Sequence, residues 1–312
     1  MTGGLYRTIT TIHCYLRNIA MKTRSVENIF SPPPVHFVGD GFRVHNFIPG
    51  VGPLSMERMD PFILLDYNSK YYFSPTDTPR GVGVHPHRGF ETVTIAYKGR
   101  VAHHDSFGNS GVIGEGDVQW MTAASGLLHK EYHEKEFARN GGDFHLVQLW
   151  VNLPAKVKMS RPKYQPITNK EMGKYFLENE GGVIEVISGD YFGTKGPAST
   201  FTPMSLLNAK LKKKGSALFE FPSRYNTALL LIEGQVAVNG SEPVPTDHFV
   251  LFRNDGEQFR LDATEDSIVM VMSGDPIHEP IAAHGPFVMN TKTQIYQAFD
   301  DLEKGKFGRL AD

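Results

Sequence analysis

The chain has 312 residues, of which 40% are hydrophobic, and its formal net charge at pH 7 is −2. This length suits one large or two ordinary domains, and the near-neutral charge argues against direct binding to nucleic acid or to an anionic membrane. No stretch approaches the roughly 18 apolar residues of a membrane span. Cys14 is the only cysteine, which rules out an intramolecular disulfide and favours a reducing compartment, so we expect a cytoplasmic protein.

Residues 1–34 are predicted to form a flexible N-terminal arm that ends at the proline-rich run from Ser31 to Pro34. The first 26 residues carry basic side chains and no acidic ones, and their hydrophobic residues are too scattered for a secretory signal. A transit peptide and a translation start at Met21 are the alternatives to a dispensable arm.

The rest of the chain reads as all-β, because 31 glycines and 20 prolines separate many short apolar runs. We expect a first β-barrel over residues 35–154, a polar connection over 155–179 and a second barrel over 180–290. Residues 291–312 are expected to form a short C-terminal helix and a tail. Thr291 and Gln294 have the spacing of a capping box, and Gly305 can end that helix.

The strand predicted over residues 91–98 alternates between two faces. We expect its inward face to be the one that shares its parity with His85 and His87. That face carries Glu91, Val93, Ile95 and Tyr97. The prediction therefore places Glu91 on the same side of the first barrel as the two histidines.

Two pairs of residues with i, i+2 spacing predict a metal site: His85 with His87, and His129 with Glu131. Side chains two residues apart on a strand point the same way, about 6.6 Å apart. Imidazole and carboxylate groups bind first-row divalent ions, so two neighbouring strands with these pairs would offer three nitrogens and one oxygen to one ion. The plainer alternative is a set of histidines satisfied by hydrogen bonds at the mouth of a barrel.

Other polar residues near these pairs fit the ion less well. Glu91 lies four residues past His87, about 13 Å along an ideal strand, so we expect it to act as a general base or a supporting group. His103 and His104 are adjacent, and adjacent side chains point to opposite faces of a strand. These two histidines are therefore poor co-ligands for one ion.

The two halves of the chain are weakly similar to each other. The four candidate ligands align with four residues that offer no strong ligand: Phe221, Ser223, Phe259 and Leu261. This pattern predicts a duplicated barrel in which only the N-terminal copy binds a metal. The C-terminal copy is expected to be filled with side chains.

The chain resembles the pirin family of the cupin superfamily over roughly residues 35–305. The motifs that carry this resemblance are the runs 60–66, 85–93, 116–123, 126–129, 148–153 and 285–291. The resemblance implies a bicupin, two β-barrels with one metal in the N-terminal barrel. In this family the ligands are the histidines of a His-Pro-His motif and a His-x-Glu pair, here His85, His87, His129 and Glu131. It also implies one divalent ion, Fe(II), and no further cofactor.

Members of this family include enzymes that oxidise the flavonol quercetin with O₂ and an animal nuclear transcriptional cofactor. We therefore expect an Fe(II)-dependent dioxygenase that acts on a flavonol or a related phenolic or enediol substrate. Glu91 and Glu131 are its candidate proton acceptors. The candidate pocket residues, which share one strand face, are Gln148, Trp150 and Asn152.

Two alternatives to the enzyme remain. One is a metal-dependent regulatory or redox-sensing protein that works through a protein partner. The other is a metal-binding fold whose activity on flavonols is incidental. An open cavity beside the ion would favour the enzyme, because a binding module has no need of one.

Overall fold

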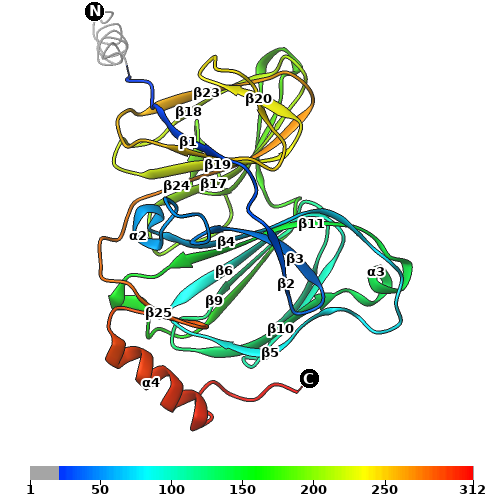
Figure 1. Ribbon diagram of the computed structural model, residues 1–312, viewed down its shortest axis with the longest axis vertical. Coiled ribbons are helices and arrows are strands. Elements are labelled where there is room, and N and C mark those ends of the chain that lie inside the picture. Colours follow the sequence, from blue (N-terminus) through cyan, green and yellow to red (C-terminus); the bar gives the residue numbers. More distant parts are fainter. Residues whose placement is uncertain (1–20, 312) are drawn as a thin grey trace, which may run out of the picture.

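The computed structural model describes residues 21–311, and strands dominate this part of the chain (Figure 1). Its α-helices are α2 (Met56–Met59), α3 (Lys135–Asn140) and α4 (Lys292–Glu303), with 3₁₀ turns at Ala155–Val157 and Glu178–Glu180. Within residues 21–311, no helix has both the length and the apolar character needed to cross a membrane.

The N-terminal half consists of two facing sheets. Its seven-stranded sheet has the order β12 (Lys163–Ile167), β9 (Val118–Thr122), β6 (Phe90–Lys98), β11 (Gly142–Asn152), β4 (Phe62–Phe73), β3 (Phe42–Ile48) and β2 (Val35–Val38). Its four-stranded sheet has the order β5 (Gly81–His87), β10 (Leu127–His133), β7 (Val101–Asp105) and β8 (Ser110–Ile113). Apolar side chains from both sheets meet in one buried cluster between them.

The C-terminal half repeats this design. Its seven-stranded sheet has the order β1 (Val26–Phe30), β22 (Phe249–Phe252), β19 (Asn226–Glu233), β24 (Ser267–Gly274), β17 (Met204–Leu211), β14 (Gly182–Ser188) and β13 (Gly173–Phe176). Its four-stranded sheet has the order β18 (Ser216–Glu220), β23 (Gln258–Ala263), β20 (Gln235–Val238) and β21 (Val244–Pro245). Two small hairpins complete the chain: β15 (Asp190–Tyr191) with β16 (Thr194–Lys195), and β25 (Ala282–His284) with β26 (Phe287–Met289).

The fold class predicted from the sequence, all-β with two halves and a short C-terminal helix, is confirmed. Each half is a sandwich of two sheets, and α4 begins at the predicted cap: Thr291 accepts from the Gln294 amide and completes a capping box. In the C-terminal half, Phe221, Phe259 and Leu261 are buried in one apolar cluster, as predicted, and none exceeds 6% exposure. Ser223 is half-buried.

The two large sheets pack against each other and form the core between the halves. Val93 and Ile95 of β6 and Leu230 of β19 are fully buried in this core. The hydroxyl of Tyr97 donates a 2.7 Å hydrogen bond to Asn208 Oδ1 on β17 of the other half. The two halves therefore share a continuous apolar layer crossed by polar contacts.

This packing contradicts the predicted orientation of β6. Val93 and Ile95 face the other half, whereas Thr94 points into the N-terminal sandwich and donates a 3.3 Å hydrogen bond to Glu131. The inward face of β6 cannot be inferred from that of β5, because the two strands belong to different sheets. Gly89, with φ at +93°, turns the chain between the two sheets, and that conformation favours glycine.

The expectation that residues 1–34 lie outside the fold is wrong for the part that the structure describes. Residues 1–20 lie outside the described residues. Strand β1, which follows them, pairs antiparallel with β22 at the edge of the C-terminal sheet. Arg24 is fully buried and donates hydrogen bonds of 2.8 and 2.7 Å to the carbonyls of Tyr225 and Pro222. The first described residues thus pack against the C-terminal half before the chain enters the N-terminal half.

The expected boundaries at residues 155–179 and 180–290 also differ from the structure. Within the supposed connection, β12 extends the N-terminal sheet and β13 extends the C-terminal sheet, so only a short link lies between them. The segment 282–289 returns to the N-terminal half, where Phe287 forms a β-bridge with Arg88. In Figure 1, β25 lies at the lower left of the N-terminal half, and α4 lies below that half. Edge strands and tails are held by distant partners, which local composition does not encode.

Candidate metal centre

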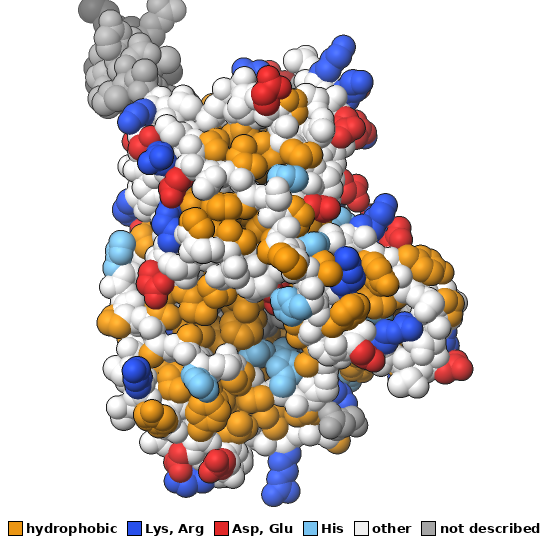
Figure 2. All heavy atoms as spheres, viewed as in Figure 1, with side chains coloured by type: hydrophobic (Ala, Val, Ile, Leu, Met, Phe, Trp, Pro, Cys, Tyr) orange, Lys and Arg blue, Asp and Glu red, His pale blue; other side chains and the backbone are white. Residues whose placement is uncertain are grey.

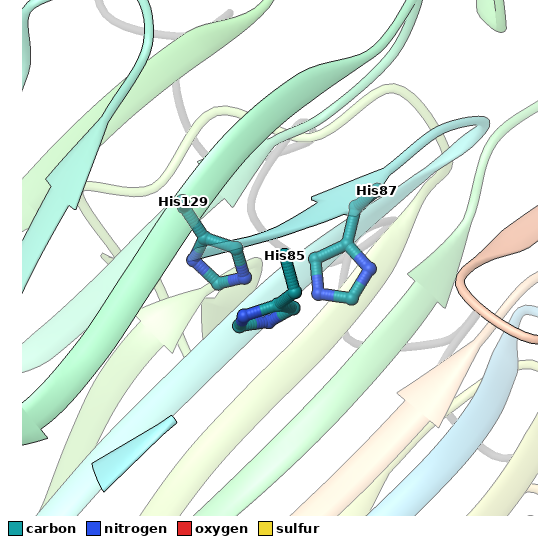
Figure 3. A group of neighbouring side chains, drawn as sticks. All are labelled: His85, His87 and His129. Atoms are coloured by element: carbon teal, nitrogen blue, oxygen red, sulfur yellow. The ribbon is translucent and has the colours of Figure 1, made fainter. Parts of the chain in front are cut away.

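Two neighbouring strands of the four-stranded sheet carry the predicted ligand pairs. Strands β5 and β10 are antiparallel, with His129 directly opposite His85 and Leu127 opposite His87. Because side chains alternate along each strand, His85, His87 and His129 point to the same face. Figure 3 shows the three imidazole rings turned toward one another, two from one strand and one from its neighbour.

The distances between these rings define a compact cluster. The ring centroids of His85 and His129 are 4.2 Å apart, those of His87 and His129 4.7 Å, and those of His85 and His87 4.9 Å. One nitrogen from each ring lies within 4.8 Å of the others. Glu131 falls into a second group of the same size, with His129 and His103. The structure therefore gathers the three predicted histidines and places Glu131 beside one of them.

Glu131 is held in place by three side chains of the large sheet. Its Oε1 accepts hydrogen bonds from Gln119 Nε2 at 2.8 Å and Thr94 Oγ1 at 3.3 Å, and its Oε2 accepts one from Gln148 Nε2 at 3.2 Å. Such bonds fix the direction of the carboxyl group. Glu131 is 5% exposed, and its hydrogen bonds matter because a buried polar group without partners is costly.

The protonation of the histidines suits metal binding. Burial, and then the neighbouring His85, hold the pKa of His87 well below its ordinary value; burial and the surrounding histidines do the same for His129. Neutral imidazoles offer a lone pair to an ion. His85 Nδ1 lies 2.8 Å from the Gly83 carbonyl, which leaves its Nε2 free to bind.

Two of the ring nitrogens are buried without a hydrogen-bond partner among the described residues: His87 Nδ1 and His129 Nε2. Buried polar atoms are nearly always satisfied, so an unpartnered pair in one cluster calls for a ligand. A divalent transition metal fits this donor set, since imidazole and carboxylate are its usual ligands. The residues present therefore fit the ion that the sequence predicts.

A cavity of about 260 Å³ opens beside this cluster. Its lining is partly polar, with His85, His87, Glu131, Gln148 and Asp66, and otherwise apolar, with Val38, Phe42, Val44, Val82, Leu146 and Trp150. Figure 2 shows histidine side chains at the base of a hollow that is ringed by hydrophobic ones. The cavity thus joins the candidate metal cluster to a surface suited to an apolar molecule.

Two of the three predicted pocket residues line this cavity and one does not. Gln148 and Trp150 are part of the lining. Asn152 is not, because its Oδ1 accepts a 2.6 Å hydrogen bond from the buried Lys158 Nζ. Gln148, Trp150 and Asn152 were predicted to share one face of β11, but the cavity ends before Asn152. Alternation along the strand was therefore not enough to predict which of them line the cavity.

Glu91 does not lie beside the histidines, contrary to its predicted role. Its Oε1 accepts a 2.7 Å hydrogen bond from Thr122 Oγ1, and it shares the face of β6 that carries Val93. Burial raises the pKa of Glu91 to about 7. It does not line the cavity, so the structure gives no route by which it could receive a proton from a molecule bound there.

Two residues of the site were missed by reasoning from the sequence. His103 faces inward opposite Glu131, stacks on Tyr164 with the rings at 10°, and lies 3.5 Å from His129 between the two Nδ1 atoms. Asp66 lines the cavity, and burial raises its pKa. Because His103 and His104 are adjacent, the sequence argued only against both of them binding the same ion. It did not exclude His103 alone. For Asp66 the sequence offered no spacing signal.

The fold and the cluster together define a bicupin with a histidine-rich site in one half, and comparison with known families agrees. The Pirin model matches residues 41–151, and the model of the pirin C-terminal cupin domain matches residues 206–308. The chain is 34% identical to human pirin over 275 residues, which cover 86% of this chain and 89% of that protein. The chain therefore belongs to the pirin family.

Closer relatives carry a name that refers to an activity. A Pseudomonas aeruginosa protein named "Putative quercetin 2,3-dioxygenase" is 43% identical over 286 residues, which cover 92% of this chain and 99% of that protein. A crystal structure of quercetin 2,3-dioxygenase from Acinetobacter baumannii is also 43% identical, with a TM-score of 0.86 over 93% of this chain and 100% of that one. The chain is thus similar along nearly its whole length to proteins named as dioxygenases.

Proposed function

We propose that this chain is a dioxygenase that holds one Fe(II) ion with His85, His87, His129 and Glu131 and oxidises a flavonol or a related phenolic or enediol. The observation that carries the proposal is the cavity beside the three histidines. A protein that worked only by binding a partner would not need such a cavity, so it supports the enzyme over the regulatory alternative. The names of the most similar relatives support the same choice.

The residues around the cluster would prepare the site for this chemistry. Bound Fe(II) would supply Lewis acidity to a substrate oxygen and a redox-active centre for O₂. Glu131 is oriented by Gln119 and Gln148, so its carboxyl group is held next to His129. Trp150 packs edge-on against His87, with ring centroids 5.1 Å apart, and restricts that imidazole.

The cavity also constrains the substrate. Its volume of about 260 Å³ lies below the roughly 300–1,000 Å³ of typical small-molecule sites. This small volume favours a compact phenolic substrate over a larger one. Asp66 is a second carboxyl in this lining, and its raised pKa suits it to accept the proton of a substrate hydroxyl.

The proposal is tested by loading the full chain with Fe(II) without oxygen and then measuring O₂ uptake. The substrate panel contains quercetin, smaller catechols, and the same compounds with their hydroxyl groups methylated. We expect about one ion per chain and uptake with hydroxylated compounds only. An iron-loaded protein that consumes no O₂ with any of them would contradict the enzyme and leave the regulatory alternative.

Asp66→Asn separates proton transfer from metal binding. We expect this variant to bind iron like the wild type, because Asp66 belongs to neither ligand group. Its rate of O₂ uptake should fall by about 10²-fold, the usual contribution of a general base. An unchanged rate would remove Asp66 from the mechanism without touching the metal assignment.

A further inference from the structure

The C-terminal tail, residues 286–311, covers the outer face of the two strands that carry the histidine cluster. Along each strand the residue next to an inward histidine points outward. His87 is followed by Arg88, and His129 lies between Leu128 and Lys130. All three outward residues contact the tail or a side chain bound to it. Figure 1 shows α4 and the chain end running below β5 and β10.

Arg88 is the central contact on the first strand. Its Nη1 donates a 2.9 Å hydrogen bond to Asp301 Oδ2 on α4, and the two side chains are only 4% and 8% exposed. Its Nε donates to the carbonyl of Ser125 at 2.7 Å, and its guanidinium lies 4.6 Å from the ring centre of Phe307. A buried arginine fixed by a charge, a carbonyl and a ring has one available orientation. Because Arg88 follows His87 directly, the fixed Arg88 side chain also restricts the backbone at His87.

The second strand is held in the same way. Ser106 Oγ donates to the Phe307 carbonyl at 2.6 Å and accepts from the Leu128 amide at 3.0 Å. Lys130 Nζ donates to the Ala311 carbonyl at 2.7 Å. The ring of Phe307 also lies over Gly126, where a Cβ would come within 2.6 Å of it. Contacts on both sides of His129 therefore lead to the same part of the tail.

The tail also fixes the backbone just after His87. The Val288 amide donates to the Arg88 carbonyl at 3.0 Å, and the Arg88 amide donates to the Pro286 carbonyl at 3.3 Å. The buried Lys158 Nζ donates to the carbonyls of Gly89 at 2.7 Å and Val288 at 3.0 Å. Nothing in this set touches the cavity, so its effect on the cluster would pass through the strands alone.

We propose that the C-terminal tail positions His87 and His129 for metal binding, with Arg88 and Asp301 as its central positioning pair. The inference rests on the proposed metal site and deepens it. Groups that orient metal ligands typically change metal affinity by 10–100-fold when they are altered. Asp301 stands 213 positions from Arg88 in the chain, so a residue remote from the site in sequence would set its geometry.

The test compares Asp301→Asn with Asp300→Asn in the full chain. The second variant is a matched control, because Asp300 and Asp301 lie on the same helix and each accepts from Gln297 and a lysine. Asp300 is 44% exposed, whereas Asp301 is buried and also binds Arg88. With Co(II) as the probe, we expect binding by Asp301→Asn to weaken about tenfold. At saturating Co(II), its visible absorption bands should also shift, which a purely structural role would not cause. Asp300→Asn should match the wild type in both.

Phe307→Leu keeps the Arg88–Asp301 pair and serves if Asp301→Asn folds poorly. It removes the ring that lies against Arg88, so a smaller loss of affinity and a changed Co(II) spectrum are expected. If both variants melt earlier but bind Co(II) with wild-type affinity and spectrum, the tail is only structural and the inference is overturned. If the wild type itself binds no Co(II), the proposed metal site fails first and the inference falls with it.

Discussion

In both halves a seven-stranded sheet faces a four-stranded sheet, and the strands occupy corresponding positions. One edge strand differs in chain order, because β12 follows β11 whereas its counterpart β1 precedes the rest of its half. Strands β5, β10, β7 and β8 of the first half correspond to β18, β23, β20 and β21 of the second. The interiors differ. The first half places imidazole, carboxylate and amide groups around a cavity, whereas the second packs Phe, Leu and Val side chains into one apolar cluster. One strand frame can therefore hold either a reactive site or a filled core.

Strand register makes this comparison specific. His129 lies opposite His85, and in the second half Phe259 lies opposite Phe219, with the two rings stacked 5.0 Å apart. The sequence alignment of the halves instead paired His85 with Phe221, two residues further along. The connection after β18 spans residues 221–225, while that after β5 spans only 88–89, and this difference in length hid the true correspondence.

The largest expected difference between the halves concerns metal. His129→Ala should abolish stoichiometric binding of Fe(II), because it removes a donor shared by both ligand groups. His104→Ala is the matched control, since His104 points away from the cluster and stacks on Tyr132. Elemental analysis of the reconstituted proteins measures both. Full metal occupancy in His129→Ala would contradict the proposed metal site. The proposed difference in function between the two halves would then fail as well.

The next largest effect is expected in the packed half. Phe259→Ala should lower the free energy of unfolding by about 3–5 kcal/mol, because it leaves a cavity in a tightly packed aromatic cluster. Leu218→Ala, on the partner strand but 38% exposed, should change it by no more than about 0.5 kcal/mol. Denaturant unfolding with a common slope provides the measurement. Equal effects of the two substitutions would mean that the second half is not a stabilising core.

A histidine introduced into the packed half tests whether the arrangement of strands is enough by itself to create a metal site. Phe219→His places a histidine at the position that corresponds to His85 in the first half. We expect a loss of about 1–3 kcal/mol, the cost of burying a polar group without a partner, and no gain of metal. Thermal unfolding with and without added Fe(II) would detect both. A variant stabilised by the ion would show that the second half keeps a latent site.

The last expected effect depends on pH and concerns Glu91, on the face of β6 that meets the other half. Its pKa is raised to about 7 by burial, so the folded protein holds a proton that the unfolded chain releases near its ordinary value of 4.5. The stability of the wild type should therefore fall as the pH rises from about 4.5 to 7. Glu91→Gln removes this dependence and should be more stable than the wild type at pH 8, by up to about 3 kcal/mol, since one pKa unit corresponds to about 1.4 kcal/mol.

Urea unfolding of both proteins at pH 5 and pH 8 measures that difference. The gap between Glu91→Gln and the wild type should be larger at pH 8. A gap that grows toward acidic pH would mean that Glu91 is ionised and stabilising in the folded protein.

The sequence by itself determined the local features of this protein. The i, i+2 spacing put His85 with His87 and His129 with Glu131 on shared faces, since alternation along a strand is a property of the backbone. Thr291 and Gln294 fixed the start of α4 through a local cap. The apolar character of Phe259 and Leu261 was enough to predict their burial. Each of these features depends on residues close together in the chain.

Only the tertiary structure decided what depends on distant strands. It turned Glu91 away from the histidines, because β6 belongs to a different sheet from β5. It brought Asp66 into the cavity and took β1 to the edge of the C-terminal sheet. It also laid Asp301 against Arg88. Which sheet a strand joins and what covers its outer face are set by packing between segments that are far apart in the chain, and no local pattern records that packing.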